Sequence, residues 1–433
     1  MQRLRPGASN DYMSAFTIEF LGLLGRWVHL ITGIAWIGAS FYFVWLDDHL
    51  LPPADELLVR KGVGGELWAV HGGGFYNAQK YRLAPQVLPQ SLHWFYWEAY
   101  STFLSGVFLL CLLYYGRAEI YLIDPAVAAL TKPEAIAISL GFIVGGWLVY
   151  DSLCRSPLGR RPAWLAAVIA ILSCAAAFAL CRLFSGRGAF IQFGAMLGTL
   201  MVANVFFVII PGQRDMVRAK REGREPDAEA GLRGKLRSVH NTYFTLPVLF
   251  TMISNHYALT FGARRNWLVL IAICAAGVLI RVYFVDRHKR HLRGGRTSPW
   301  PALLGVLLLA AVAAGLAPRA SPYSASPSTT AAASTTAAAS TIAPPSTPAQ
   351  EFSAVRHIVA ERCVPCHSAM PTQPGFSTAP NGLTLDTPEA LLAHVTVIAP
   401  QVQTRAMPIG NLTGMTDSER SRLLDWIGHG APH

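Results

Sequence analysis

The sequence predicts an all-α protein in which a polytopic membrane helix bundle, of about eight spans, precedes a small tethered globule. Of its 433 residues 52% are hydrophobic and only 14% are charged, which is too apolar for an ordinary soluble enzyme. A series of apolar runs matches the thickness of a membrane. A Ser/Thr/Ala/Pro-rich stretch then separates these runs from a more polar tail. We therefore expect a membrane domain over 1–317, a low-complexity linker over 318–350 and a globule over 351–433.

Eight apolar runs approach or exceed the roughly 20 residues that cross about 30 Å of hydrocarbon. Nothing near the N-terminus resembles a cleavable signal peptide, so the first run is expected to remain as an anchor in the lipid bilayer. The runs cover residues 17–46, 92–115, 134–152, 163–184, 188–211, 241–261, 266–285 and 299–317.

The positive charge of the chain predicts its topology. The formal net charge of +11 lies mostly in loops between the apolar runs, so no nucleic-acid partner is expected. The loop between runs five and six carries eight Lys or Arg residues, and the loop between runs seven and eight carries five. The positive-inside rule assigns these loops to the cytoplasm. Both termini and the C-terminal globule are then periplasmic, on the outer side of a bacterial inner membrane.

The most specific motif is the C-x-x-C-H signature Cys363-Val364-Pro365-Cys366-His367. It attaches a c-type haem: two thiols add across the vinyl groups, and the adjacent histidine ligates the iron. A zinc knuckle is the alternative, but zinc usually needs a second Cys/His pair, and the chain has no other C-x-x-C. Because c-type haem is attached on the periplasmic side in bacteria, the motif predicts the same topology as the charges.

The globule has the size of a class I cytochrome c domain. A Met-Pro pair about 40 residues after the signature predicts Met407 as the sixth iron ligand, and a thioether at this position raises the reduction potential. Met415 is the rival methionine, and His394 is a further alternative. Thr416 and Glu419 have the spacing of a capping box, which predicts a final helix.

Ionisable side chains inside the apolar runs are costly and are therefore candidates for function. The first run places Arg26 and His29 on one polar helical face. His29 is either a haem b ligand or substrate-pocket residue, or it makes an interhelical hydrogen bond beside closely packed glycines. Glu98, in the second run, is a candidate proton acceptor or a partner for an arginine.

The sixth run is the richest in polar residues, with His240 and Asn241 at its start and His256 near its end. These two histidines are about 24 Å apart along a helix and cannot share one small site. Asn204, in the fifth run, is expected to make a helix–helix hydrogen bond. The loop around His71 lacks the Lys-Ser/Thr of a P-loop and predicts a re-entrant or lid segment, or a flexible turn.

Together these motifs resemble the bacterial integral-membrane, cytochrome-c-linked urate oxidases, also described as urate hydroxylases. The resemblance is carried by three regions of the membrane domain, residues 26–38, 71–76 and 240–257, and by two motifs of the tail, at 363–368 and 407–411. The resemblance implies oxidation of urate to 5-hydroxyisourate without direct formation of hydrogen peroxide. The electrons pass to the cytochrome domain and on to a respiratory electron acceptor. The candidate catalytic residues rest on their own chemistry, and they are Arg26, His29, Glu98, His240, Asn241 and His256.

The route of the electrons stays open in the sequence. A single hop across about 30 Å of hydrocarbon is implausible, so either the pocket opens toward the haem side or the bundle holds a relay such as haem b. His29 and His256 are the first candidate ligands for that relay. The alternative function is a quinol-interacting or respiratory electron-transfer subunit with a fused cytochrome c.

Overall fold

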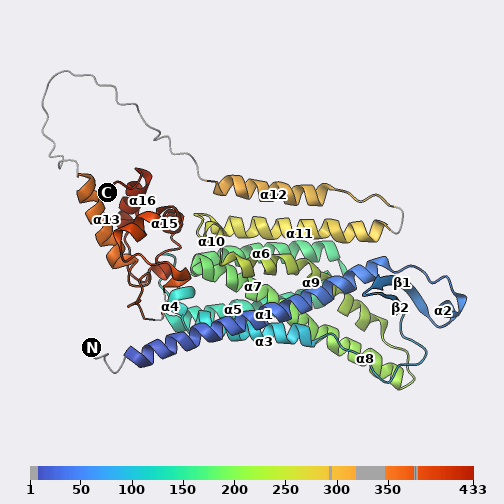
Figure 1. Ribbon diagram of the computed structural model, residues 1–433. Helices are drawn as coiled ribbons and strands as arrows, with labels where there is room; N and C mark the ends of the chain where they lie inside the picture. Colours follow the sequence, from blue (N-terminus) through green and yellow to red (C-terminus); the bar gives the residue numbers. More distant parts are fainter. Residues whose placement is uncertain (1–7, 292–294, 318–346, 375, 377–378) are drawn as a thin grey trace. The chain divides into compact units, whose positions relative to one another are not determined.

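The computed structural model describes residues 8–291, 295–317, 347–374, 376 and 379–433. The chain divides into two units (Figure 1): residues 16–312 form one, and residues 1–15 with 313–433 form the other. Most of the linker predicted over 318–350 lies outside the described residues, and the first helix after it begins at Pro348. Each unit is described by itself.

The first unit is a helix bundle with one β-hairpin. Its elements are α1 (Ala8–His49), α2 (Glu56–Arg60), β1 (Val63–His71), β2 (Gly74–Tyr81), α3 (Trp97–Leu109), η1 (Leu110–Tyr115), α4 (Ala118–Tyr121), α5 (Lys132–Arg155), η2 (Pro157–Arg160), α6 (Pro162–Leu183), α7 (Gly186–Asn204), η3 (Val205–Ile209), α8 (Ile210–Arg221), α9 (Ala228–Ser254), α10 (Ala258–Phe261), α11 (Asn266–His291) and α12 (Trp300–Leu316).

Each of the eight predicted spans falls on a helix, but within the described residues six helices are long and apolar enough to cross a membrane. Of the other two, α12 has only 17 residues. The first half of α9 carries several charged residues, and α9 ends at Ser254, so His256 lies beyond the helix. By length and composition alone, six of the described helices therefore qualify as membrane spans.

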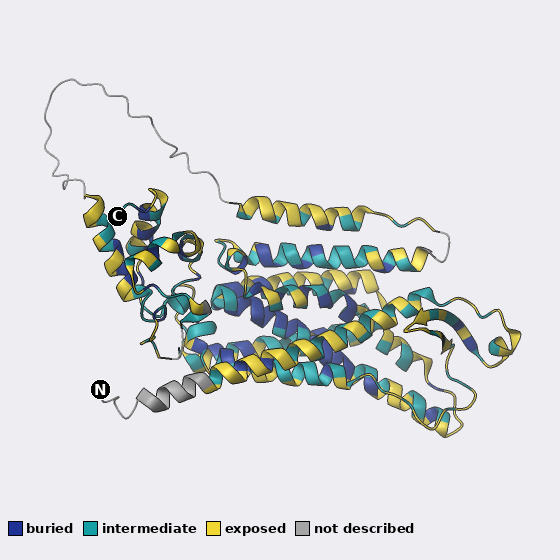
Figure 2. Cartoon of the chain, in the orientation of Figure 1, coloured by how far each residue is buried: buried dark blue, intermediate teal, exposed yellow. Residues whose placement is uncertain are grey.

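α7 is the buried axis of the bundle. In the continuous helix Gly186–Arg221, 61% of the most apolar window is buried, against at most 22% in any other candidate span. Helices α5, α6 and α9 pack against α7, and Figure 2 shows the buried residues gathered along it. Gly194 permits the contact with α9, because a Cβ at this position would clash with Thr251.

Two stretches of the bundle are wound as π-helix. η1 continues α3, and η3 continues α7. Such turns are rare and occur often at functional sites. η1 carries Tyr114 and Tyr115, and η3 directly follows the buried Asn204. The two stretches coincide with the two places where polar side chains gather inside the bundle.

The segment around His71 is a β-hairpin, so the prediction of an entirely α-helical chain is wrong at this point. β1 and β2 pair antiparallel, with Val70 opposite Phe75. Gly72 and Gly73 form the turn with φ values of +56° and +80°, which glycine adopts without steric cost. The segment is a two-stranded antiparallel ribbon whose turn is made by the two glycines.

The C-terminal tail is a small helical unit around one core. Trp426 stacks on Phe352 with ring centroids 5.8 Å apart, which joins its last helix to its first. The predicted capping box is confirmed: Glu419 N donates to Thr416 Oγ1 at 3.2 Å, and Thr416 N donates to Glu419 Oε2 at 2.7 Å. Its elements are α13 (Pro348–Arg362), η4 (Pro380–Gly382), α14 (Pro388–Ala393), α15 (Val395–Gln403), η5 (Ile409–Asn411) and α16 (Asp417–Gly428).

Candidate functional site

The haem-attachment signature forms a single tight turn at the end of α13. His367 N donates to Cys363 O at 2.9 Å, and Cys366 N donates to the same carbonyl at 3.1 Å. His367 Nδ1 donates to Leu383 O at 3.0 Å. A hydrogen bond of this kind sets the tautomer of a metal-binding histidine and leaves Nε2 to hold the iron.

Burial sets the protonation of the turn. Burial lowers the pKa of His367 and outweighs the opposing hydrogen bond to Leu383, so the imidazole is neutral, as ligation requires. Burial raises the pKa of the Cys363 thiol to about 12 and also raises that of Cys366.

Met407, the predicted sixth ligand, lies half-buried in the loop between α15 and α16. Its rival Met415 is 3% exposed and packs in the core of the unit. His394 Nδ1 donates to Ala390 O at 2.7 Å, which ties that side chain to its own helix. The described residues hold no cluster of three His, Cys, Asp or Glu, but haem iron needs only one axial histidine and one methionine. The donor set therefore fits this group.

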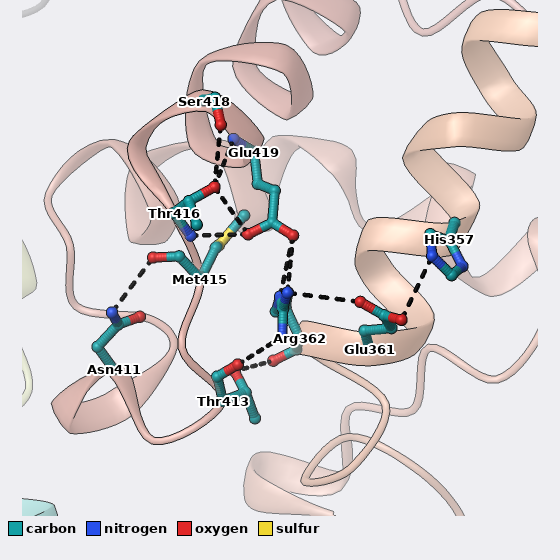
Figure 3. A network of polar contacts seen from close by, with 9 residues as sticks. All are labelled: His357, Glu361, Arg362, Asn411, Thr413, Met415, Thr416, Ser418 and Glu419. Atoms are coloured by element: carbon teal, nitrogen blue, oxygen red, sulfur yellow. Dashed lines mark hydrogen bonds and ion pairs between the residues drawn. The ribbon is translucent and has the colours of Figure 1, made fainter.

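Arg362, directly before the attachment turn, ties the turn to the segment that leads into α16 (Figure 3). Its Nη1 donates to Thr413 O at 2.8 Å, and Thr413 Oγ1 donates to Arg362 O at 2.8 Å. Its Nε and Nη2 both donate to Glu419 Oε1 at 3.0 Å. The network joins the end of α13 to the first turn of α16.

This network predicts that the C-terminal unit loses stability in acid. Burial acts to raise the pKa of Glu419, but hydrogen bonds from Arg362 and Thr416 outweigh it and hold that pKa below its usual range. The contribution of Glu419 is therefore complete above its unfolded pKa of about 4.3 and is lost as pH falls through the lower folded value. We expect Glu419→Gln to weaken the unit near pH 7 and to flatten this acid dependence.

Limited proteolysis of the full-length protein between pH 3 and pH 7 measures this effect. Asp417→Asn is the matched control, because Asp417 forms an exposed ion pair with Arg405 at 2.7 Å. Equal acid sensitivity in the wild type and Glu419→Gln would contradict the assignment.

A buried polar network joins α5, α7 and α9 at the Arg-rich end of the bundle. Arg237 is 4% exposed and pairs with Asp151 at 2.5 Å, and its Nη1 donates to Asn204 Oδ1 at 3.2 Å. Arg237 is one of the eight Lys or Arg residues that the sequence assigns to the loop between runs five and six. The structure corrects this assignment, because Arg237 is buried in α9. We call this group the inner network, and its members are Tyr150, Asp151, Asn204, Arg237, His240 and Asn241.

The direction of the bonds around Asn204 follows from Arg237, which can only donate. Asn204 must accept through Oδ1, so its Nδ2 donates to Tyr150 Oη at 3.0 Å and to Asn241 Oδ1 at 2.8 Å. Tyr150 Oη also shares a hydrogen bond with His240 Nδ1 at 2.8 Å. Each of these groups already has a partner, and the predicted helix–helix role of Asn204 is confirmed.

A second polar group lies at the opposite end of the bundle, around η1 and the start of α7. Tyr114 is 6% exposed, and its Oη donates to Asn255 Oδ1 at 3.3 Å. Arg187 stands at the start of α7, and the exposed Arg26 lies near η1, because a Cβ at Gly22 would lie 3.4 Å from Arg26 Nη1 and 3.7 Å from Leu113. We call this group the outer cluster, and its members are Arg26, Tyr114, Tyr115, Ser139, Arg187, Gln192 and Asn255.

Gln192 is the unusual member of the outer cluster. Its side chain is 1% exposed, and its Oε1 accepts from Ser139 Oγ at 2.8 Å. Its Nε2 is buried and has no hydrogen-bond partner among the described residues. A buried amide donor without a partner is costly, and in native structures such a group usually bonds a water, an ion or a ligand. Gln192 Nε2 is therefore a donor that the contacts of the outer cluster leave available.

The six predicted catalytic residues do not meet in one pocket. His240 and Asn241 belong to the inner network, at the same end as Glu98 in the first turn of α3. Glu98 Oε2 is buried, and the described residues offer it no hydrogen-bond partner. Arg26 belongs to the outer cluster, and the exposed His256 follows Asn255 there.

His29 has the contacts of a helix-packing residue. Its Nδ1 lies 3.0 Å from both Thr102 O and Ser105 Oγ of α3. A Cβ at Gly106 would lie 3.1 Å from the imidazole, so glycine is what admits the ring. Of the alternatives raised by the sequence, these contacts match the interhelical hydrogen bond. The haem b relay draws no support from them.

Sequence reasoning missed Tyr150, Arg187 and Gln192. A usable signal existed for Gln192, which stands in an apolar run as Asn204 does. Arg187 lies at the start of the same run, and its guanidinium lies 5.3 Å from the centroid of the Phe261 ring. The roles of Tyr150, Arg187 and Gln192 depend on contacts with other helices, and no local sequence pattern predicts these contacts.

The comparisons bear on the bundle unit. The model of the urate oxidase N-terminal family matches residues 15–317, which is well over half of the chain and includes both polar groups. The comparisons with curated proteins and with solved structures gave no match. The family match agrees with the resemblance carried by the sequence motifs at both ends of the bundle. The chain belongs to the urate oxidase N-terminal family.

Proposed function

We propose that this protein oxidises urate to 5-hydroxyisourate in the membrane and transfers the electrons to a c-type haem on its own C-terminal unit. The observation that carries the proposal is the family match over 15–317 on a chain that also contains the attachment turn and Met407. With an electron-accepting unit attached, the oxidation has no need to form hydrogen peroxide directly.

The overall reaction balances with the respiratory acceptor as the two-electron oxidant. Urate and one water give 5-hydroxyisourate, two protons and two electrons, and the water oxygen becomes the new hydroxyl group. A haem held by Cys363, Cys366 and His367 would supply one-electron transfer, so the two electrons would reach the acceptor in successive steps.

The outer cluster is our candidate for the urate site. Urate is a planar anion rich in carbonyl oxygens. Arg187 and Arg26 offset such a charge, and Gln192 Nε2 supplies an unused donor. The inner network suits this role less, because its groups already bond one another.

The position of the outer cluster also addresses the electron route. The outer cluster lies at the end of the bundle opposite the Arg-rich loops. The positive-inside rule assigns those loops to the cytoplasm, so it assigns the end with the outer cluster to the haem side of the membrane. A urate molecule held there would need no electron transfer across the full hydrocarbon thickness.

One observation favours the alternative, a quinol-interacting electron-transfer subunit. An apolar groove of about 410 Å³ runs between α5, α6 and α7 and reaches Tyr150, which bonds to His240. A groove of this kind is suited to an isoprenoid tail whose ring lies near a polar side chain.

Anaerobic reduction of the haem by urate tests the proposal. In purified membranes, urate is expected to reduce the c-type haem, read from its visible absorption, whereas allantoin is not. A haem that dithionite reduces but urate leaves oxidised would overturn the proposal. Reduction by ubiquinol alone would establish the alternative.

Gln192→Leu tests the urate site. The substitution removes Gln192 Nε2, which has no hydrogen-bond partner among the described residues. A hydrogen bond to a charged ligand contributes about 1.5–3 kcal/mol, so its loss is expected to raise the KM for urate roughly tenfold to hundredfold. A merely structural Gln192 predicts unchanged KM, because leucine fills an apolar environment. Gln213→Leu, at the far end of the same continuous helix, is the matched control.

A further inference from the structure

We propose that Arg420 is the positioning residue that holds the Met407 loop in place as the sixth-ligand arm of the haem site. This inference rests on the proposed c-type haem. Arg420 lies in α16, one residue after Glu419, which holds Arg362 beside the attachment turn. The first turn of α16 therefore contacts both the end of α13, beside the attachment turn, and the loop that carries Met407.

The contacts of Arg420 converge on the loop that carries Met407. Its Nη1 donates to Met407 O at 2.6 Å and to Val402 O at 3.3 Å. Its Nη2 donates to Asn411 Oδ1 at 3.1 Å. The side chain is 6% exposed, so these bonds form away from water, where a lost donor is costly to the acceptors left behind.

The loop needs such support because its backbone is unusual after Met407. Gly410 and Asn411 have φ values of +56° and +51°, and a left-handed conformation is uncommon for a residue other than glycine. Asn411 is fixed from both sides: its Oδ1 accepts from Arg420, and its Nδ2 donates to Met415 O at 3.2 Å. Arg420 thus spans the loop from Val402 to Asn411.

Arg420 also carries a positive charge that is buried within the unit that holds the site. A cation close to a haem favours the reduced, less positive iron, and an axial thioether does the same. Loss of Arg420 is therefore expected to lower the reduction potential in two ways.

Arg422 is the matched control. It lies two residues further along the same helix, and its Nε donates to Glu351 Oε1 at 3.3 Å, in an ion pair in which its side chain is 47% exposed. An exposed pair of this kind contributes little to stability. Arg422→Gln removes the same charge from α16 without touching the Met407 loop.

The experiment compares full-length wild type, Arg420→Gln, Arg420→Lys, Met407→Leu and Arg422→Gln. Three properties are measured: covalent haem by peroxidase stain, the long-wavelength absorption band of methionine-ligated ferric haem, and the midpoint potential by redox titration. We expect Arg420→Gln to retain covalent haem, to lose most of the methionine band as Met407→Leu does, and to show a lower potential. Arg420→Lys is expected to lie between, and Arg422→Gln to match the wild type.

An unchanged band and potential in Arg420→Gln would overturn the inference, as would a methionine band that survives in Met407→Leu. If Arg420→Gln does not fold, Asn411→Ala removes only the hydrogen bond from Arg420 to Asn411. The methionine band and the midpoint potential of that variant then test the inference. A wild-type protein without covalent haem would instead refute the proposed function, so the two failures are distinguishable.

Discussion

Replacing both Cys363 and Cys366 with alanine is expected to abolish covalent haem and urate-dependent electron transfer together. In the proposed site the two thiols would form the thioether bonds, and His367 alone would hold a haem only by coordination. Haem staining of denaturing gels measures the first effect, and anaerobic urate titration of membranes measures the second. No other prediction made for this chain has a larger expected effect on activity.

Cys111→Ala is the control for this pair, since Cys111 is an exposed free cysteine of the bundle. It is expected to leave both readouts unchanged. Haem staining that persists in the double alanine variant would exclude the attachment turn. Urate turnover that persists without the haem would show that another acceptor takes the electrons.

Arg237→Leu is expected to destabilise the bundle by about 1–3 kcal/mol, because the buried Asn204 Oδ1 loses its donor and Asp151 keeps only the exposed Arg155 as a partner. The inner network is the polar link between α5, α7 and α9, so the loss spreads to all three helices. Thermal unfolding of the detergent-solubilised protein measures the change.

Arg233→Leu is the matched control on the same helix. Arg233 is 59% exposed, and it pairs with Glu229 at 3.4 Å, so removing it is expected to cost about 0–1 kcal/mol. The double variant Asp151→Leu/Arg237→Leu is expected to recover part of the lost stability, because it removes both charges. Equal stability of the Arg237 and Arg233 single variants would contradict a buried ion pair.

The two polar groups change how the intramembrane residues are understood. His240 Nδ1 shares a hydrogen bond with Tyr150 of α5, so its place in the inner network is one of helix association. The outer cluster instead combines two arginines with an unpartnered amide. It is there, close to Arg26 and His256, that we expect the binding of urate.

The sequence alone was sufficient wherever a property depends on consecutive residues. The apolar runs identified every membrane-length helix, because a span needs about 20 apolar residues in a row. The capping box at Thr416 is likewise local, and so is the turn Cys363–His367, whose attachment of haem stays a prediction. The family resemblance followed from such motifs and agrees with the match over 15–317.

Tertiary structure decided everything that depends on partners from different helices. Three examples are the burial of Arg237, the lack of a partner for Gln192 Nε2 among the described residues, and the hydrogen bond from Arg420 to Met407 O. Each depends on residues that are distant in sequence, and the two arginines resemble surface charges in the sequence. The hairpin at His71 was missed because glycine-rich turns have several conformations and only strand pairing selects one. A side chain's type is written in the sequence, but whether it is solvated, paired or left with a free donor depends on which helices pack around it.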